Sequence, residues 1–131
     1  MKLRLSKRPF RLTLGERGEM AAWKYLSDRG YKIIEKNYRA PFGEIDVIAE
    51  KSGRIIFTEI KTRSSEKLGL PQEAVGRLKQ KKLAQLAAFY LKKQKKENSR
   101  VSFEVLAVLW SEKGSHQFTL IENAFELEGE F

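Results

Sequence analysis

Two short segments near the middle of the chain place charged residues among apolar ones. Gly43-Glu44-Ile45-Asp46 is followed, after twelve intervening residues, by Glu59-Ile60-Lys61 at the end of an apolar run. An ionised side chain loses several kcal/mol of solvation when it leaves water, unless a partner or a metal compensates. Charges that only keep a protein soluble do not need this setting. The pattern therefore indicates a site that carries out chemistry.

Asp46 and Glu59 have the oxygen chemistry that a hard divalent cation requires. Mg²⁺ keeps several waters, so one or two carboxylates and a backbone carbonyl are enough to hold it. Such a cation supplies phosphodiester hydrolysis with a nucleophilic water and neutralises the phosphate, while Lys61 would orient or help to deprotonate that water. Zn²⁺ is a poor match, because the chain has no cysteine and a single histidine, His116. We therefore expect a site for Mg²⁺ or Mn²⁺.

The two segments are predicted to lie on neighbouring strands, over residues 43–49 and 54–62, joined by a short polar turn. Side chains alternate along a strand, so Glu44 and Asp46 share one face of the first strand. The hairpin brings Asp46 across from the later half of the second strand, where Glu59 lies. Both carboxylates then face one point. The alternative is a cross-strand ion pair on a half-exposed face, which would contribute little to stability.

A helix is predicted over residues 14–28. Thr13-Leu14-Gly15-Glu16 has the form of a capping box, and Gly30 suits the end of the helix. A second helix, over residues 72–94, is predicted from Pro71 in its first turn and an apolar stripe that includes Leu78. Further strands are expected over residues 31–38, 101–110 and 117–121. The order is α-β-β-β-α-β-β, which predicts an α/β fold with a central mixed five-stranded sheet flanked by helices.

The length and composition favour one globular domain. We expect a basic N-terminal tail over residues 1–12, a single domain over 13–123 and an acidic tail over 124–131, which either frays or covers the basic surface. No apolar run approaches the roughly 20 residues of a membrane-spanning helix. The basic N-terminus lacks the apolar stretch of a secretory signal, so a cytoplasmic location is expected.

Basic residues are concentrated in two blocks. Residues 1–39 have a net charge of +7 and residues 76–100 a net charge of +8, whereas residues 40–75 have −1 and residues 101–131 have −5. Two basic blocks thus bracket a slightly acidic centre that contains Asp46 and Glu59. A nucleic-acid enzyme with a cation in the gap would show this distribution. A basic protein with solvated lysine faces would show it too, and charge alone does not choose between them.

The wider sequence resembles a known family. The matching segments are Gly15-x-x-Gly18-Glu19-x-x-Ala22, Asn37-Tyr38-Arg39, Gly43-Glu44-Ile45-Asp46, Glu59-Ile60-Lys61-Thr62-Arg63 and Lys79-Gln80. Together they are similar to the YraN-like family of small bacterial proteins, over about residues 13–110. Asp46 followed by Glu59-x-Lys61 also matches the signature of the PD-(D/E)xK nuclease superfamily, which includes restriction endonucleases and Holliday junction resolvases. The resemblance implies a restriction-endonuclease-like core, although Ile45 stands where many members have proline.

This resemblance implies roles for individual residues. Asp46 and Glu59 would be metal ligands, Lys61 the catalytic lysine and Glu19 the acidic residue contributed by the first helix. Glu16 is a rival of Glu19, because one of them is the capping-box partner. Gln80 would reach the site. Glu44 is either a residue that supports the ligands or a charge at the strand edge.

Several basic residues are candidates for contacts with the nucleic-acid backbone, with a solvated face as the alternative. They are Arg39, Arg63, Lys79, Lys81 and Lys82. Trp23 and Trp110 are expected in the core, and His116 on the surface.

The first functional hypothesis is a Mg²⁺- or Mn²⁺-dependent deoxyribonuclease of DNA repair or recombination. The resolvase likeness implies branched DNA as substrate and a homodimer. The second hypothesis is a non-catalytic nucleic-acid-binding module that keeps the nuclease fold. A third is a protein–protein adaptor with acidic partners, which nothing in the sequence recommends.

Overall fold

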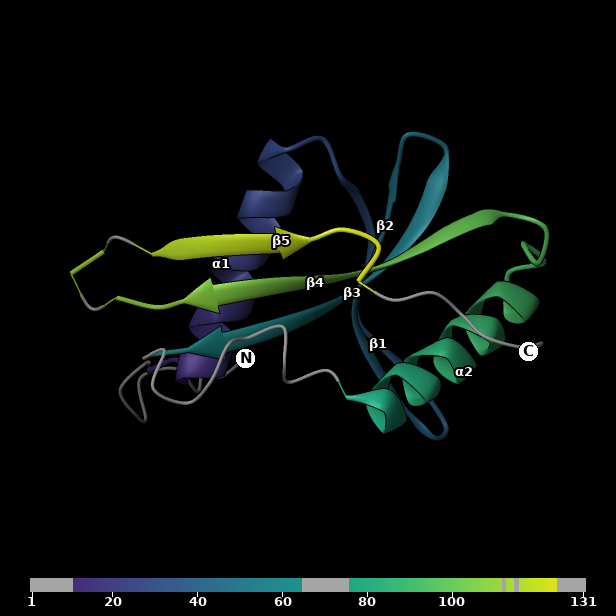
Figure 1. The fold of residues 1–131 in the computed structure, drawn as a ribbon, viewed down its shortest axis with the longest axis horizontal. Coiled ribbons are helices and arrows are strands. Elements are labelled where there is room, and N and C mark those ends of the chain that lie inside the picture. Colours follow the sequence, from purple (N-terminus) through teal and green to yellow (C-terminus); the bar gives the residue numbers. More distant parts are fainter. Residues whose placement is uncertain (1–10, 65–75, 112, 115, 125–131) are drawn as a thin grey trace, which may run out of the picture.

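The centre of the fold is a five-stranded sheet in the order β1-β2-β3-β4-β5. In this computed structural model, residues 11–64, 76–111, 113–114 and 116–124 are described. The elements are α1 (Leu14–Asp28), β1 (Lys32–Ala40), β2 (Gly43–Lys51), β3 (Arg54–Arg63), α2 (Arg77–Lys93), β4 (Arg100–Leu109) and β5 (Gln117–Ile121) (Figure 1). The predicted fold class and element order are confirmed.

The sheet is mixed because one connection crosses over. Strands β3 and β4 are parallel, from Arg54↔Arg100 to Arg63↔Leu109, and α2 lies between them in the chain. The other neighbouring pairs are antiparallel. A parallel connection requires such a crossover, whereas antiparallel neighbours need only a turn.

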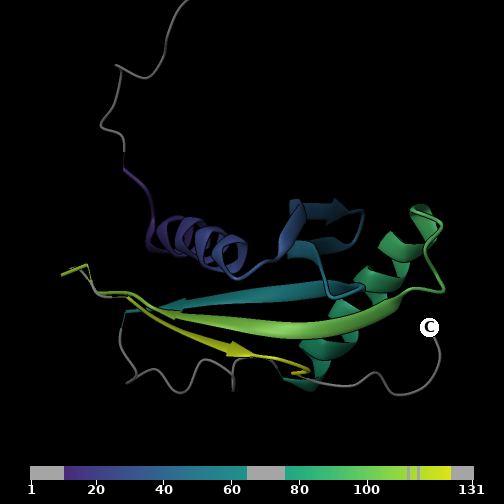
Figure 2. The same ribbon diagram turned by 90° about the horizontal axis from the view of Figure 1, so that it is seen from above.

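The two helices cover opposite faces of the sheet, and each face has its own apolar core. Helix α1 packs chiefly on β3, where Ala22 and Leu26 meet Ile56 and Ile60. Helix α2 packs on β2 and β1, and its apolar side chains join a cluster with Ile48, Phe57 and Phe103. Figure 2 shows α1 on one side of β3, β4 and β5. The alternation along β3 therefore decides which helix each of its side chains faces.

Helix α1 begins at the predicted capping box. The backbone N–H of Glu16 donates to Thr13 Oγ1 at 3.1 Å, and the backbone N–H of Thr13 donates to Glu16 Oε1 at 2.8 Å. Gly30, with φ of +89°, lies in the left-handed region just beyond the end of the helix. Glu16, and not Glu19, is therefore the capping-box partner of Thr13.

Helix α2 starts later than the sequence suggested. Gly76 is its N-cap residue, with extended backbone angles, and the helix runs from Arg77 to Lys93 rather than from residue 72 to 94. Glycine is accepted at an N-cap but costs free energy inside a helix, which explains the later start. Leu78 does not join the apolar stripe, because at the first turn its side chain points to solvent and is 85% exposed. Pro71 lies outside the described residues.

The remaining expectations concern the ends of the chain and the membrane. The proposed tails, residues 1–12 and 124–131, fall almost entirely outside the described residues, so the domain limits stay predictions. Neither of the two described helices has the length and apolar character needed to cross a membrane.

Candidate functional site

The site forms where β2 separates from β3. Strand β2 pairs with β1 along nearly its whole length, from Gly43 to Glu50, but with β3 only from Val47 to Lys51. The last pair at this end is Val47↔Thr58, and Asp46 and Glu59 are the next residues on each strand. We call this point the split. It places the two carboxylates together in the wall of one pocket, as the predicted hairpin required.

Asp46 is fixed by a backbone donor of the neighbouring strand. Its Oδ2 accepts a hydrogen bond of 2.8 Å from the backbone N–H of Ile60. Because β2 has already left β3 here, the carboxylate takes the place that a β2 carbonyl would hold in a continued ladder. Burial, and then the nearby charge of Glu59, raise the pKa of Asp46 to about 6, although the Ile60 hydrogen bond opposes the shift.

Glu59 is almost completely buried, with 6% exposure, and it contacts two lysines through one oxygen. Lys79 Nζ lies 2.8 Å from Glu59 Oε2, and Lys61 Nζ lies 3.4 Å from the same atom. Burial lowers the pKa of Lys61, and the Lys79 ammonium adds to that effect while Glu59 opposes it. Burial alone would lower the pKa of Lys79, but its hydrogen bond to Glu59 raises it. Two ammonium groups therefore compete for one carboxylate.

Helix α1 brings Glu19 to the same region. Burial, and then the charges of Glu44 and Glu16, raise the pKa of Glu19, while a hydrogen bond with the Asn37 side chain opposes this. The charge of Glu19 also acts on Asp46. Asn37 belongs to the motif Asn37-Tyr38-Arg39, but the sequence predicts no role for it in the site. Asn37 lies on β1 with a φ of +51°, and its side chain joins this strand to α1 through Glu19.

A glycine sets the distance between α1 and β3. A Cβ atom at Gly18 would overlap the side chain of Thr62 on β3. Gly18 is buried, so the absence of its side chain lets the helix approach the strand closely. Glu19 follows directly, and its position depends on that close approach.

The carboxylates open into a pocket of about 380 Å³ between the split and helix α2. Lys82 narrows the α2 side, since its Cε lies 3.2 Å from where a Cβ of Gly43 would be. Strands β2 and β3 supply the acidic wall, and α2 supplies lysines and an apolar wall. The lining residues are Gly43, Glu44, Asp46, Glu59, Lys79, Lys82, Leu83 and Leu86.

The other predicted residues lie around this pocket or away from it. Arg39 pairs with Glu44 across β1 and β2, with Nε 3.6 Å from Oε2. Arg63 donates from Nη1 to the carbonyl oxygen of Thr62 at 3.1 Å. Gln80 is half-buried and Lys81 is exposed, and neither lines the pocket. Their contacts with metal ligands or nucleic acid stay predictions.

The donor set can be compared with the needs of a metal. Among the described residues, no group of three or more histidine, cysteine, aspartate or glutamate side chains is arranged to hold an ion. Asp46 and Glu59 provide two carboxylates, which suits a cation that keeps several waters, such as Mg²⁺, and not one that needs a full protein cage. The raised pKa of Asp46 reflects burial and crowded negative charge that a divalent cation would relieve. The residues therefore fit Mg²⁺ or Mn²⁺.

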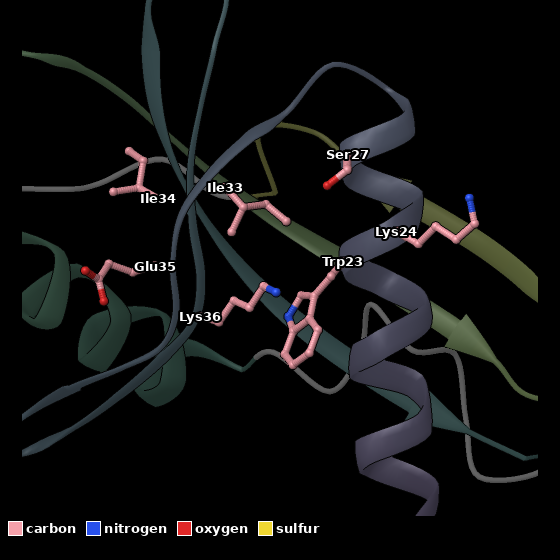
Figure 3. A pocket seen from close by; sticks show the side chains of 7 residues that line it. All are labelled: Trp23, Lys24, Ser27, Ile33, Ile34, Glu35 and Lys36. Carbon is pink, nitrogen blue, oxygen red and sulfur yellow. The ribbon is translucent and has the colours of Figure 1, made fainter.

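A different hollow, of about 610 Å³, lies between α1 and β1 (Figure 3). Trp23 and Lys36 face one another there, with the ammonium 4.3 Å from the ring centre, while Ile34 and Glu35 point away from α1. The hollow has no paired carboxylates. Trp23 packs half-buried beside the α1 core, as does Trp110, which stacks on His116 at 3.7 Å between ring centres. This hollow offers no chemistry comparable to that of the split.

Comparison with known proteins gives a consistent family assignment. The model of the "Uncharacterised protein family UPF0102" matches residues 18–108. A UPF0102 protein of Syntrophus aciditrophicus is 44% identical over 116 residues, covering 88% of this chain and 91% of the relative. A UPF0102 protein of Thermodesulfovibrio yellowstonii is 47% identical over 115 residues, covering 88% and 97%. One of Pelobacter propionicus is 38% identical over 122 residues, covering 92% and 87%. The chain, with its capped helix, its split hairpin and its buried glutamate, belongs to the UPF0102 (YraN-like) family.

Proposed function

We propose that this protein is a divalent-metal-dependent endonuclease that hydrolyses DNA phosphodiesters. The observation that supports this proposal is the meeting of Asp46 and Glu59 at the split, with Lys61 beside Glu59. Stability alone does not explain the arrangement, because a buried carboxylate with a raised pKa weakens the fold at neutral pH. Carboxylates held in this way are typical of a functional site.

Each residue has a defined part in the proposed reaction. Asp46 and Glu59 would hold Mg²⁺ or Mn²⁺, which neutralises charge on the phosphate and supplies an activated water. The Ile60 N–H keeps the Asp46 carboxylate in one orientation. Lys61, whose pKa is lowered by burial, is suited to exchanging a proton and to offsetting negative charge on the phosphate. Glu19 would add negative charge from α1 and keep its carboxylate close to Asp46.

The substrate is inferred from charge. The chain has a net charge of +9, and Lys82 stands at the mouth of the pocket beside the acidic wall. Lysines in this position attract a polyanion and bring its backbone to the carboxylates. DNA is the proposed polyanion. A branched substrate, a role in repair or recombination and a homodimer are the finer parts of the proposal, and they rest on the nuclease resemblance.

The test is cleavage of labelled linear duplex, single-stranded and four-way-junction DNA with Mg²⁺, Mn²⁺ or EDTA. Asp46→Asn keeps an acceptor for the Ile60 N–H but removes the charge, so metal-dependent cleavage should fall at least a hundredfold, about 2.7 kcal/mol. Asp28→Asn is the matched control, because Asp28 is an exposed partner of Lys24 at the end of α1. Cleavage that persists in Asp46→Asn would show that another site, or a contaminant, cuts the DNA.

A specific observation favours a second candidate, a nucleic-acid-binding module without activity. Lys79 Nζ lies 2.8 Å from Glu59 Oε2, so this carboxylate already has a charged partner within the protein. This candidate predicts salt-dependent binding of DNA or RNA with no cleavage in any metal. The same assay, read together with binding at several salt concentrations, separates the two candidates.

A further inference from the structure

A second buried carboxylate lies on the opposite face of the sheet from the split. Glu104, on β4, is 5% exposed and lies beside Thr58 of β3 in the parallel register. Its Oε1 accepts a hydrogen bond of 2.6 Å from the hydroxyl of Tyr31. Within the described part of the chain, Glu104 forms no ion pair and its second oxygen accepts no hydrogen bond, although the charges of Lys51 and Arg54 act on it from the cavity wall.

Glu104 lines a cavity of about 250 Å³ at the start of β3 and β4. Tyr31, Ile56 and Ser102 form the inner wall with it, and Tyr31 and Ile56 belong to the core on the α1 side. The pocket at the split instead meets Leu83 and Leu86 of the α2 core. The two cavities therefore open on different faces, and this inference does not depend on the proposed nuclease activity.

The rim of the cavity carries three basic residues, Lys51, Arg54 and Arg100, and one acidic residue, Glu122. Arg54 and Arg100 are direct neighbours in the β3–β4 register, and Lys51 lies beside them on the rim. Arg54 donates from Nη1 to Ser102 Oγ at 3.2 Å, but neither arginine forms an ion pair with another described residue. Two adjacent guanidinium groups repel one another unless an anion lies between them, and a phosphate bridges such a pair well.

The cavity thus combines two kinds of recognition. Inside, an unpartnered carboxylate oxygen would accept a hydrogen bond from an N–H group, and outside, two arginines would hold an anion. A carboxylate is a natural acceptor for the exocyclic amine of cytosine, and arginine is a natural partner of phosphate. A nucleotide carries both groups in one molecule.

We propose that the Glu104 cavity binds a nucleotide unit whose base carries an exocyclic amino group, with its phosphate at Arg54 and Arg100. The unit is either a free nucleotide or part of a nucleic-acid strand. A neighbouring hollow of about 440 Å³ shares Tyr31, Lys51 and Glu122 with this cavity and leaves room for an adjoining unit. Along β3, Arg54 lies five residues from Glu59, roughly 17 Å, so this site would hold nucleic acid at a distance from the split.

Cytidine and uridine monophosphates provide the first test, because their bases differ only at positions 3 and 4 of the ring. Cytosine has an unprotonated N3 and an amine at position 4, whereas uracil has an N3–H and a carbonyl oxygen at position 4. Isothermal titration calorimetry at neutral pH should give CMP a roughly tenfold higher affinity than UMP. Equal affinities, or a preference for UMP, would overturn the proposal. The native protein alone is sufficient for this measurement.

Glu104→Gln gives a sharper test. The Tyr31 hydroxyl donates a hydrogen bond, so it should hold the amide oxygen and turn the new NH₂ group toward the ligand. The preference should then reverse, with UMP binding more tightly than CMP. An unchanged preference in folded Glu104→Gln, checked by circular dichroism, would exclude Glu104 as the group that reads the base.

Two further variants separate the parts of the site. Arg54→Ala with Arg100→Ala should weaken the binding of CMP and UMP by the same factor, and Lys92→Ala, at an exposed position of α2, should change neither. Short oligo-dC and oligo-dT strands distinguish the source of the ligand. If oligo-dC is preferred while mononucleotides fail to bind, the unit belongs to a strand. If neither strands nor mononucleotides bind, the proposal is wrong.

Discussion

Lys79 Nζ lies closer to Glu59 Oε2 than Lys61 Nζ does, at 2.8 Å against 3.4 Å. Lys79 of α2 is therefore the main counterion of a carboxylate that a metal would need. The Glu-x-Lys spacing in the sequence instead predicts that Lys61 is the nearer lysine. A cation that binds Glu59 must share this oxygen with Lys79 or displace it. Displacement would free the Lys79 ammonium for a phosphate.

The first prediction concerns this competition. Lys79→Met keeps most of the side-chain length but removes the charge, so the affinity for Mn²⁺ should rise. The expected gain is roughly threefold, because the Lys79–Glu59 ion pair is partly exposed and therefore weak. Electron paramagnetic resonance of Mn²⁺ without nucleic acid measures this directly. Lys81→Met is the control, because Lys81 is exposed on the same helix and does not line the pocket. An unchanged affinity in Lys79→Met would mean that the lysine does not compete.

The second prediction concerns pH. Asp46 has a folded-state pKa of about 6, above its ordinary value of 3.8, so the folded protein binds this proton more tightly than the unfolded chain. The associated stability is fully present below pH 3.8 and is lost as the pH rises through about 6. At pH 8 without metal, the ionised group costs on the order of 3 kcal/mol.

Asp46→Asn should therefore stabilise the metal-free protein at pH 8 and change its stability little at pH 4. Urea denaturation in EDTA at both pH values measures the free energy of unfolding. Asp28→Asn, on the exposed end of α1, should give no such pH-dependent gain. An equal effect of Asp46→Asn at both pH values would contradict the raised pKa.

The third prediction compares two glycines of the same helix. Gly18→Ala should destabilise the protein by about 1–3 kcal/mol, because the new methyl group overlaps Thr62. At Gly15 the nearest atom to an added Cβ is Thr13 Oγ1 at 3.9 Å, so Gly15→Ala should be neutral or stabilising by up to about 1 kcal/mol. Thermal denaturation of both variants gives the signs. Loss of stability in both would point to a general effect of α1, and not to the contact with Thr62.

The fourth prediction concerns a buried hydroxyl. Thr58 is fully buried, and its Oγ1 finds no hydrogen-bond partner among the described residues. An unsatisfied buried hydroxyl costs about 1–3 kcal/mol, so the isosteric Thr58→Val should raise the free energy of unfolding by roughly 1 kcal/mol. Thr119→Val, at an exposed position of β5, should change it by less than about 0.5 kcal/mol. Destabilisation by Thr58→Val would reveal that the hydroxyl has a partner, such as a bound water.

The sequence predicted the local parts of this protein well. The capping box at Thr13, the hairpin that carries Asp46 and Glu59, and the order of the elements all follow from short-range patterns, because turn residues and side-chain alternation act over a few positions. The contact of Lys79 with Glu59 could not be predicted in this way. It depends on how α2 lies across the split, which is a matter of tertiary packing.

Two other structural features could not be predicted from the sequence, for similar reasons. Leu78 fits the apolar period of α2 but lies at its first turn with its side chain 85% exposed, and the period alone does not show where packing begins. Glu104 belongs to no motif. Its partner Tyr31 is 73 residues away in the chain, so only the folded sheet brings the two together.

Strand β3 contributes side chains to both faces of the sheet, so the core and the site both depend on its register against β2. Glu59 and Phe57 face α2, while Thr58 and Ile60 face α1. A slip of one residue against β2 would turn Glu59 and Lys61 into the apolar layer beneath α1, and would remove the carboxylate from its place beside Asp46. A misregistered chain would therefore lose both its stability and its chemistry. The side-chain alternation that builds the core therefore also ensures that only the native register forms the site.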